Sequence, residues 1–441
     1  MVGTTIEFFD FYVYATASVL VFPQLFFPKV DPTTALLASL ATFGLAFVAR
    51  PLGSVVLGHF GDRRGRKATL VASLLMMGVA TFAIGLLPTY QQIGIFAPLA
   101  LAVLRFTQGI ALGGEWSGAA LLATESSSVE RRGWAAMWPQ LGAPVGFLLA
   151  NGSMLVLLAL LGGGTPGQKD LNQPFYEWGW RVPFLASAVM VAFGLYVRLK
   201  LTETPVFQRA IRRGESVKAP LAELLRRNWT EVVVGTLAVV STFTIFYVVT
   251  TWMLGYGTAA RDAKHGLGIG FLGFLQLQLV AVLFFAASVP VAGRLIDRFG
   301  RRRVLIGTSI GIIAYGFCFD AFLSSEKAST TGVLVFLIIG MVLVGLAYGP
   351  LGAVLPELFP TNVRYTGSGI AFNLAGILGA AVAPFIATWL TVHHGVAYVG
   401  YYLVGSAVIT LIAQVAMRET REVSLDSTAQ GSQMDRLSSQ S

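Results

Sequence analysis

Long apolar segments alternate with short polar segments along almost the whole chain. A helix needs about 20 predominantly apolar residues to cross the hydrocarbon core of a bilayer, and the apolar segments reach that length. The pattern therefore predicts an all-α membrane protein with twelve transmembrane helices. We place them near residues 2–22, 36–58, 68–87, 97–122, 133–161, 181–200, 232–254, 270–293, 304–323, 332–354, 367–392 and 397–417.

The two halves of the chain carry the same loop motif, first between spans 2 and 3 and again between spans 8 and 9. The shared residues are Gly58, Asp62, Arg63, Gly65 and Arg66 and, 235 positions later, Gly293, Asp297, Arg298, Gly300 and Arg301. A second loop repeats at an offset of 232, with Gly113, Glu125 and Arg132 matching Gly345, Glu357 and Arg364. A duplicated set of six helices explains both repeats and predicts two pseudo-symmetric six-helix bundles.

The residue types of the first repeated motif predict a gate. Its glycines permit a tight turn and a close approach of helices, and its charges lie at helix ends, where backbone dipoles interact with them. Such contacts can form in one conformation and break in another. The alternative of a phosphate-binding loop fails, because the required spacing of Gly, Lys and Ser or Thr is absent.

The distribution of basic residues predicts the orientation. The loops that hold the repeated motifs, the central connector and the C-terminal tail contain 23 Lys and Arg, whereas the opposite loops contain 6. By the positive-inside rule, both termini are expected in the cytoplasm. The predicted organisation is a first bundle, a basic connector that contacts lipid headgroups, a second bundle and a disordered tail, over residues 1–200, 201–231, 232–417 and 418–441.

Composition excludes several classes of function. Apolar residues make up 55% of the chain and charged residues only 12%, far from a soluble domain. The net charge of +9 comes from short clusters between spans, so we expect no nucleic-acid partner. Cys318 is the single cysteine, and no catalytic pair or metal-ligand cluster of recognisable spacing occurs. We therefore expect a monomer that is neither an enzyme nor a sensor with a soluble output domain, with no cofactor and no metal.

Five charged residues lie inside the predicted spans of the first half: Glu7, Asp10, Arg50, Arg105 and Glu115. A charge at the bilayer centre costs roughly 2.5 to 3.5 kcal/mol on insertion scales, so such residues are candidates for function. Arginine keeps its proton, whereas a carboxylate in an apolar setting can release and regain one. This makes Glu7 and Asp10 the best candidates to carry a proton. The alternative is a purely structural ion pair with the arginines.

The internal repeat supplies a control for these charges. At the offsets that the loops fix, Arg50 corresponds to Phe285, Arg105 to Leu337 and Glu115 to Ala347. What both halves retain is expected to be architecture or gating, and what only the first half retains is expected to be chemistry. Further polar and aromatic candidates for a substrate site are Tyr12, Tyr247, Gln276 and Asn373.

Several of these segments resemble the major facilitator superfamily, and in particular its metabolite:proton symporter branch. The stretch from Gly58 to Lys67 is similar to the superfamily's loop signature, and Arg105-Phe-Thr-Gln-Gly109 to its signature in span 4. Ile6-Glu-Phe-Phe-Asp-Phe-Tyr12, Arg50-Pro-Leu-Gly53 and Leu355-Pro-Glu-Leu-Phe-Pro-Thr-Asn-Val-Arg364 resemble elements of the branch. The similarity extends over nearly the whole chain.

The resemblance implies a multi-pass transporter of a bacterial inner membrane, in which two bundles rock about a central site. It implies import of a small carboxylate-bearing or zwitterionic metabolite together with protons, with Arg105 in proton coupling. The expected partners are thus the substrate, protons and the lipid bilayer. A drug or metabolite antiporter and a sugar-type uniporter stay open as alternatives, since Gly142-Ala-Pro-Val-Gly146 and Leu201-Thr-Glu-Thr-Pro205 partly resemble motifs of those groups.

Overall fold

The computed structural model describes residues 1–64, 66–113, 115–125, 127–162, 171–200, 220–261, 266–360 and 363–421. All regular elements in these segments are helices. The first half contains α1 (Val2–Leu20), α2 (Phe22–Leu25), α3 (Pro32–Arg64), α4 (Arg66–Leu86), α5 (Tyr90–Ile93), α6 (Phe96–Leu112), α7 (Glu115–Glu125), η1 (Val129–Arg131), α8 (Arg132–Gln140), α9 (Gly142–Leu161), η2 (Phe175–Gly179) and α10 (Arg181–Lys200).

The second half repeats this plan after α12 (Pro220–Arg227), a short helix within the predicted connector. Its elements are α13 (Trp229–Leu237), α14 (Val240–Tyr247), η3 (Val248–Trp252), α15 (Met253–Thr258), α16 (Phe271–Phe299), α17 (Arg301–Gly316), α18 (Phe319–Leu323), α19 (Thr330–Tyr348), α20 (Leu351–Glu357), α21 (Arg364–Gly376), η5 (Ile377–Ala381), α22 (Ala383–His394) and α23 (Val396–Ala416). Residues 201–219 of the predicted connector and 422–441 of the predicted tail lie outside the described residues.

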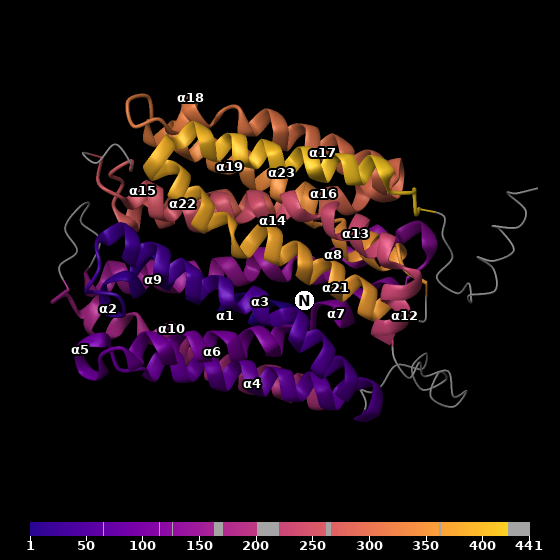
Figure 1. Ribbon diagram of the computed structural model, residues 1–441, viewed down its shortest axis with the longest axis horizontal. Coiled ribbons are helices and arrows are strands. Elements are labelled where there is room, and N and C mark those ends of the chain that lie inside the picture. The colour runs from indigo at the N-terminus through magenta and orange to yellow at the C-terminus, as the bar shows by residue number, and fades with distance from the viewer. Residues whose placement is uncertain are drawn as a thin grey trace, which may run out of the picture.

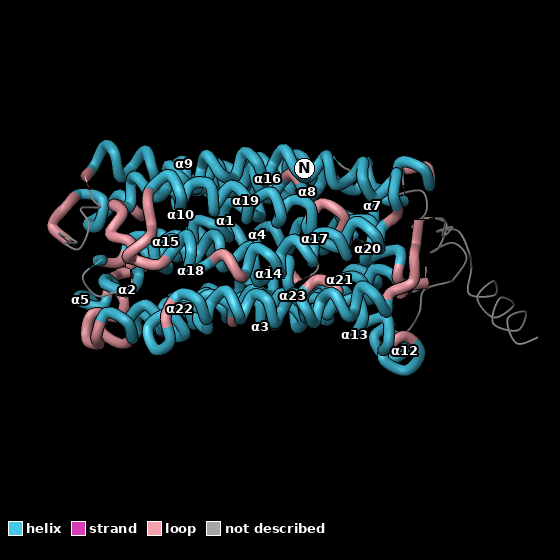
Figure 2. The backbone as a smooth tube through the Cα atoms, turned by 90° about the horizontal axis from the view of Figure 1, so that it is seen from above, coloured by secondary structure: helices cyan, strands magenta, loops and turns pink. Residues whose placement is uncertain are grey.

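Figure 1 shows the helices running along one common direction, with the first half below and the second half above. Figure 2 shows the same elongated arrangement from above. We call the end that holds α7, α12 and the loop between α16 and α17 the repeat end, and the end that holds α2, α5, α15 and α18 the far end. The prediction of two six-helix bundles is confirmed; we refer to α1–α10 as the first bundle and to α13–α23 as the second.

Local sequence explains where individual helices begin and break. Asp31 precedes Pro32 at the start of α3, and its carboxylate accepts hydrogen bonds from the backbone N–H groups of Thr33 and Thr34. Hydrogen bonds from Thr34 lower the pKa of Asp31, a group outside the span. Pro350 separates α19 from α20, because proline has no N–H for the helical ladder. The predicted spans thus correspond to helices, several of them interrupted once or twice.

Eight helical segments in the described chain are long and apolar enough to cross a membrane by themselves. Two further apolar helices, Val71–Leu86 and Phe96–Leu112, are shorter. The second of these contains Arg105, Thr107 and Gln108 in an otherwise apolar sequence.

Candidate functional site

Four charged side chains meet in the interior of the first bundle. Glu7 and Asp10 come from α1, Arg50 from α3 and Arg105 from α6, and each is at most 7% exposed. The charge of Arg50 interacts with Glu7, and the charge of Arg105 interacts with Asp10 and with Arg50. The structure thus brings together the four residues that stood out in the sequence.

Aromatic rings surround the two arginines. The Phe11 ring lies between them, with its centroid 4.9 Å from the Arg50 guanidinium carbon and 4.4 Å from that of Arg105. Tyr14 covers Arg105 at 4.0 Å, and Phe47 covers Arg50 at 4.6 Å. Cation–π contacts of this kind stabilise a guanidinium where water is excluded. They hold both cations in place without consuming their hydrogen-bond donors.

A chain of buried hydrogen bonds connects Asp10 to Arg105. Asp10 Oδ2 lies 3.0 Å from the Thr81 hydroxyl, which accepts a 2.7 Å hydrogen bond from Gln108 Nε2. Gln108 Oε1 in turn accepts a 3.0 Å hydrogen bond from Arg105 Nη1. Thr81 and Gln108 therefore connect the carboxylate and the guanidinium, which are not hydrogen-bonded to each other.

Two tyrosines contact the opposite bundle at the centre of the molecule: Tyr12 of the first bundle and Tyr247 of the second. Tyr12 packs on Phe246 with ring centroids 5.6 Å apart, and Tyr247 packs on Phe11 at 6.2 Å. Tyr247 also interacts electrostatically with both buried arginines. The second bundle thus contributes a phenol to the charged cluster of the first.

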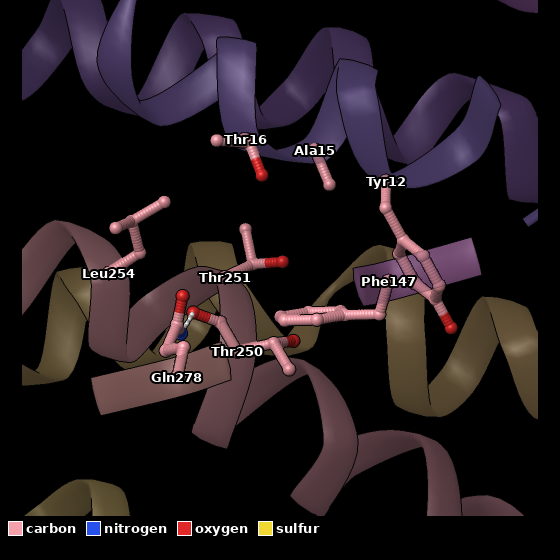
Figure 3. A pocket seen from close by; sticks show the side chains of 8 residues that line it. All are labelled: Tyr12, Ala15, Thr16, Phe147, Thr250, Thr251, Leu254 and Gln278. Carbon is pink, nitrogen blue, oxygen red and sulfur yellow. Dashed lines mark hydrogen bonds between the residues drawn. The ribbon is translucent and has the colours of Figure 1, made fainter. Parts of the chain in front are cut away.

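A small cavity lies between the bundles beside Tyr12, on the far-end side of the charged cluster. Its volume is about 10 Å³, and neutral polar side chains from both bundles line it, among them Thr16, Thr251 and Gln278. Figure 3 shows Thr16 and Thr251 facing the same space from opposite bundles. A cavity of this size holds about one water molecule, which is too little space for a metabolite in this conformation.

Two predicted substrate residues lie elsewhere. Gln276 is exposed on the outer face of α16, whereas Gln278, two residues later, is buried and lines the cavity. Asn373 is buried, but its Nδ2 donates hydrogen bonds to the Ser54 hydroxyl at 2.8 Å and to the Gly113 carbonyl at 3.1 Å. Asn373 therefore joins α21 to the first bundle, one helical turn of α3 away from Arg50.

The second copy of the repeated motif joins the bundles at the repeat end. Asp297 accepts hydrogen bonds from the backbone N–H groups of Gly133 and Trp134, at 2.8 and 2.9 Å, in the first turn of α8. A carboxylate is favourable there because the first N–H groups of a helix lack helical partners. A Cβ on Gly293 would lie 3.1 Å from the Gly133 carbonyl oxygen, so glycine permits this close approach of α16 and α8.

Buried charges reinforce the same contact. Arg301 donates hydrogen bonds to both carboxylate oxygens of Glu357, at 3.0 and 2.9 Å, and Arg132 of the first bundle adds one at 3.2 Å. The Thr420 hydroxyl bonds Glu357 Oε2 at 2.7 Å. Removing one partner from such a buried group leaves an uncompensated charge, which typically costs 3 to 5 kcal/mol.

Other predicted motif residues have separate positions or fall outside the described part. Gly300 adopts a φ of +91° before α17, a conformation that favours glycine, and Arg298 packs on the Phe299 ring. Gly58 lies within α3, Gly65 lies outside the described residues, and so do the side chains of Asp62, Arg63, Arg66, Glu115 and Glu125.

Sequence reasoning missed several members of the site. Thr81, Thr251 and Gln278 are neutral residues inside predicted spans, and nothing in a single sequence separates them from packing residues. The Trp116 ring stacks on Phe372 across the bundle interface at 3.8 Å, which the apolar pattern also does not reveal. The repeat offset of 235 could have linked Tyr12 to Tyr247, since both end a Phe-Tyr pair.

Comparison with known proteins supports this architecture. A family model described as Major Facilitator Superfamily matches residues 1–377 and 275–436. The proton:xylose symporter XylE superposes with a TM-score of 0.70 at 16% identity, covering 95% of each chain. At that identity the likeness concerns the fold.

Sequence relatives extend over nearly the whole chain. The inner membrane metabolite transport protein YhjE of Escherichia coli (strain K12) is 52% identical, over 96% of this chain and 94% of the relative. The shikimate transporter of the same organism is 35% identical, over 95% and 93%. Its proline/betaine transporter is 32% identical, over 95% and 82%. The chain therefore belongs to the major facilitator superfamily and is a multi-pass membrane transporter of metabolites, not an enzyme.

Proposed function

We propose that the protein is a proton-coupled symporter that imports a small carboxylate-bearing or zwitterionic metabolite across an inner membrane by alternating access. The observation that carries the proposal is the buried cluster in which Asp10 connects to Arg105 through Thr81 and Gln108. Relatives named for shikimate, proline and betaine agree with it, because each of these molecules bears a carboxylate. In this reading the repeat end faces the cytoplasm.

Arg50 and Arg105 are the proposed carboxylate-binding groups. Arg105 Nε and Nη2 and Arg50 Nε are buried and have no hydrogen-bond partner among the described residues. Buried donors without a partner cost free energy, which an incoming anion would recover. Arginine also presents its N–H groups in a planar fork that matches a carboxylate. The cluster is therefore prepared for an anionic group of the substrate.

Asp10 is the proposed proton carrier, with Glu7 as the second acidic member. The Thr81 hydroxyl has one hydrogen and two acceptors within reach, Asp10 Oδ2 at 3.0 Å and the Met77 carbonyl at 2.9 Å. When Asp10 is ionised, Thr81 donates to it. When Asp10 is protonated, Asp10 donates to Thr81 and Thr81 donates to Met77. The network thus accommodates both protonation states without moving a heavy atom.

Charge balance gives a physical basis for coupling. With both carboxylates ionised, two negative groups balance Arg50 and Arg105. Protonation of Asp10 leaves one excess positive charge in a site of low dielectric, which favours binding of a carboxylate. By linkage, the bound carboxylate favours the proton to the same extent. Proton and substrate are therefore expected to bind together.

Uptake into proteoliposomes tests the proposal. An inward proton gradient is imposed, and accumulation is measured for labelled di- and tricarboxylates, shikimate, proline, betaine and a hexose. We expect one acid or zwitterion to accumulate and a protonophore to erase the accumulation. Transport that only equilibrates a hexose would favour the uniporter, and proton-driven export would favour the antiporter; either result contradicts the proposal.

A further inference from the structure

The cavity beside Tyr12 differs in chemistry from the charged cluster, which lies on its repeat-end side. The described residues that line it include no Asp, Glu, Lys or Arg. They supply hydroxyl groups from Thr16 and Thr251 and the amide of Gln278, and all three residues are at most 4% exposed.

Gln278 is held with its amide group at the cavity wall. Its Nε2 donates a 2.8 Å hydrogen bond to the Thr250 carbonyl and a longer one, 3.4 Å, to that of Val249. These two carbonyls belong to η3, a π-helical turn, in which the widened ladder changes the pattern of backbone partners. The amide nitrogen is thereby engaged, which leaves the amide oxygen as the acceptor that Gln278 can offer to a ligand.

Thr16 provides the facing contribution from the first bundle. Its hydroxyl lies 2.5 Å from the side-chain oxygen of Asn151 on α9, so the two residues hold each other in place. Thr16 is four residues from Tyr12, or about 6 Å along α1. Tyr12 lines the cavity and also interacts with Arg50. Tyr12 therefore lies next to both Arg50 and the cavity, so a molecule bound to Arg50 through a carboxylate can extend past Tyr12 toward Thr16 and Gln278.

We propose that Thr16, Thr251 and Gln278 form the second half of the substrate site and bind uncharged hydrogen-bonding groups, so that the transported metabolite is a hydroxylated monocarboxylate. A second carboxylate would find no cation in this cavity, and an ammonium group would find no anion. This inference rests on the proposed function, because it assumes that Arg50 binds the carboxylate. It adds which chemistry the rest of the substrate has.

Matched ligands test the inference on the purified full-length protein, with dissociation constants taken from thermal-shift titrations. One set is gluconate, hexanoate and adipate, which share six carbons but differ in hydroxyls and second carboxylate. The other set is shikimate and cyclohex-1-ene-1-carboxylate, and betaine is the ammonium-bearing probe. We expect a hydroxylated monocarboxylate to bind at least about tenfold tighter than its deoxy analogue, as expected for one or two buried hydrogen bonds.

Variants assign this preference to the cavity. Gln278→Leu is expected to reduce the tenfold preference to less than about threefold while binding of the deoxy acid stays unchanged. Thr251→Val, which keeps the side-chain shape, should reduce it in the same direction. Gln276→Leu, two residues away on the outer face of α16, is the matched control and should keep it.

The possible results separate this inference from the proposed function. If an acid binds but adipate, hexanoate or betaine binds as tightly as the hydroxylated acid, the inference is wrong and the carboxylate site stands. If Gln278→Leu keeps the full preference, the assigned residues are wrong. If none of the carboxylates binds, the proposed function fails together with the inference.

Discussion

The two bundles share an aromatic frame but differ in charge. At the offset of 235, Phe8, Phe11 and Tyr12 of α1 correspond to Phe243, Phe246 and Tyr247 of α14. In the structure Phe11 packs on Tyr247, and Tyr12 packs on Phe246. Replacing each residue by its counterpart at the offset of 235 turns the first contact into the second. The pseudo-symmetry relation between the bundles thus holds for these two ring contacts at the centre of the interface.

The charges break this relation. Asp10, Arg50 and Arg105 correspond to the apolar residues Ile245, Phe285 and Leu337, and the connecting residues Thr81 and Gln108 correspond to Gly316 and Gly340. The retained rings are the surface on which the bundles meet, whereas the lost charges are not needed for that contact. Under the proposed function, the first bundle would bind the proton and the carboxylate, and the second would supply a neutral wall.

The largest expected effect is at Arg105. Arg105→Leu removes the guanidinium at the end of the hydrogen-bond chain but keeps an apolar side chain among the rings. We expect proton-driven uptake to fall at least about 100-fold, as for the loss of two charge-assisted hydrogen bonds to the carboxylate of the substrate. Leu337→Met, at the corresponding position of the second bundle, should stay within about twofold. Equal loss in both variants, measured at equal amounts of folded protein, would contradict the division of roles.

Arg50 tests the carboxylate half of the comparison. Arg50→Leu should raise the half-saturating substrate concentration by about 10- to 100-fold, because one charged hydrogen-bond donor group is lost. The maximal rate should change less. Phe285→Leu at the corresponding position keeps an apolar side chain and should leave the half-saturating concentration unchanged. Concentration series of uptake distinguish the two, and a change in maximal rate alone for Arg50→Leu would argue against carboxylate binding there.

Thr81 tests whether the hydrogen-bond chain matters beyond packing. Thr81→Val keeps the shape but removes the hydroxyl that donates to ionised Asp10. Ionised Asp10 then loses a donor and the protonated form is favoured, so the pH dependence of uptake should move toward higher pH. Thr107→Val is the control, because among the described residues the Thr107 hydroxyl bonds only the Val103 carbonyl of its own helix. An unchanged pH profile for Thr81→Val would show that the hydrogen bonds from Asp10 to Arg105 take no part in proton coupling.

Much of this arrangement could be predicted from the sequence, because charge inside an apolar span is rare. Glu7, Asp10, Arg50 and Arg105 were identified on that ground, and burial of all four in one cluster agrees with it. The sequence did not show which of the two glutamines of α16 faces the interior. Two residues correspond to 200° around a helix, so Gln276 and Gln278 lie on nearly opposite faces, and apolar residues on all sides hide which face is inside.

Asn373 shows a second limit of sequence reasoning. A buried amide is compatible with a substrate site or with a contact between helices, and only the structure shows its partners, Ser54 and Gly113. The same applies to Thr81 and Gln108, whose roles depend on neighbours from α1 and α6. Neutral polar residues acquire meaning from geometry, whereas buried charges already carry it in the sequence.

The smallest expected effect is at the repeat end. Asp297→Asn keeps the shape but removes the charge and one of the two acceptor oxygens, so one hydrogen bond from the first turn of α8 is lost, worth about 0.5 to 1.5 kcal/mol. The repeat end should open about two- to tenfold more often. The measurement is the labelling rate of a cysteine introduced at Gln140, buried at this end, in a Cys318→Ser background. Arg298→Gln is the control. Equal labelling rates in the two variants would show that Asp297 does not stabilise the closed repeat end.

The most direct test of the central claim is proton movement driven by substrate. Proteoliposomes containing a pH-sensitive dye receive an inward gradient of the transported acid, without any imposed pH gradient. We predict acidification of the interior for the wild type and for Ile245→Val, and none for Asp10→Asn, which still exchanges labelled substrate for unlabelled substrate. Acidification by Asp10→Asn equal to that of the wild type would contradict the account, because a group outside this cluster would then carry the proton.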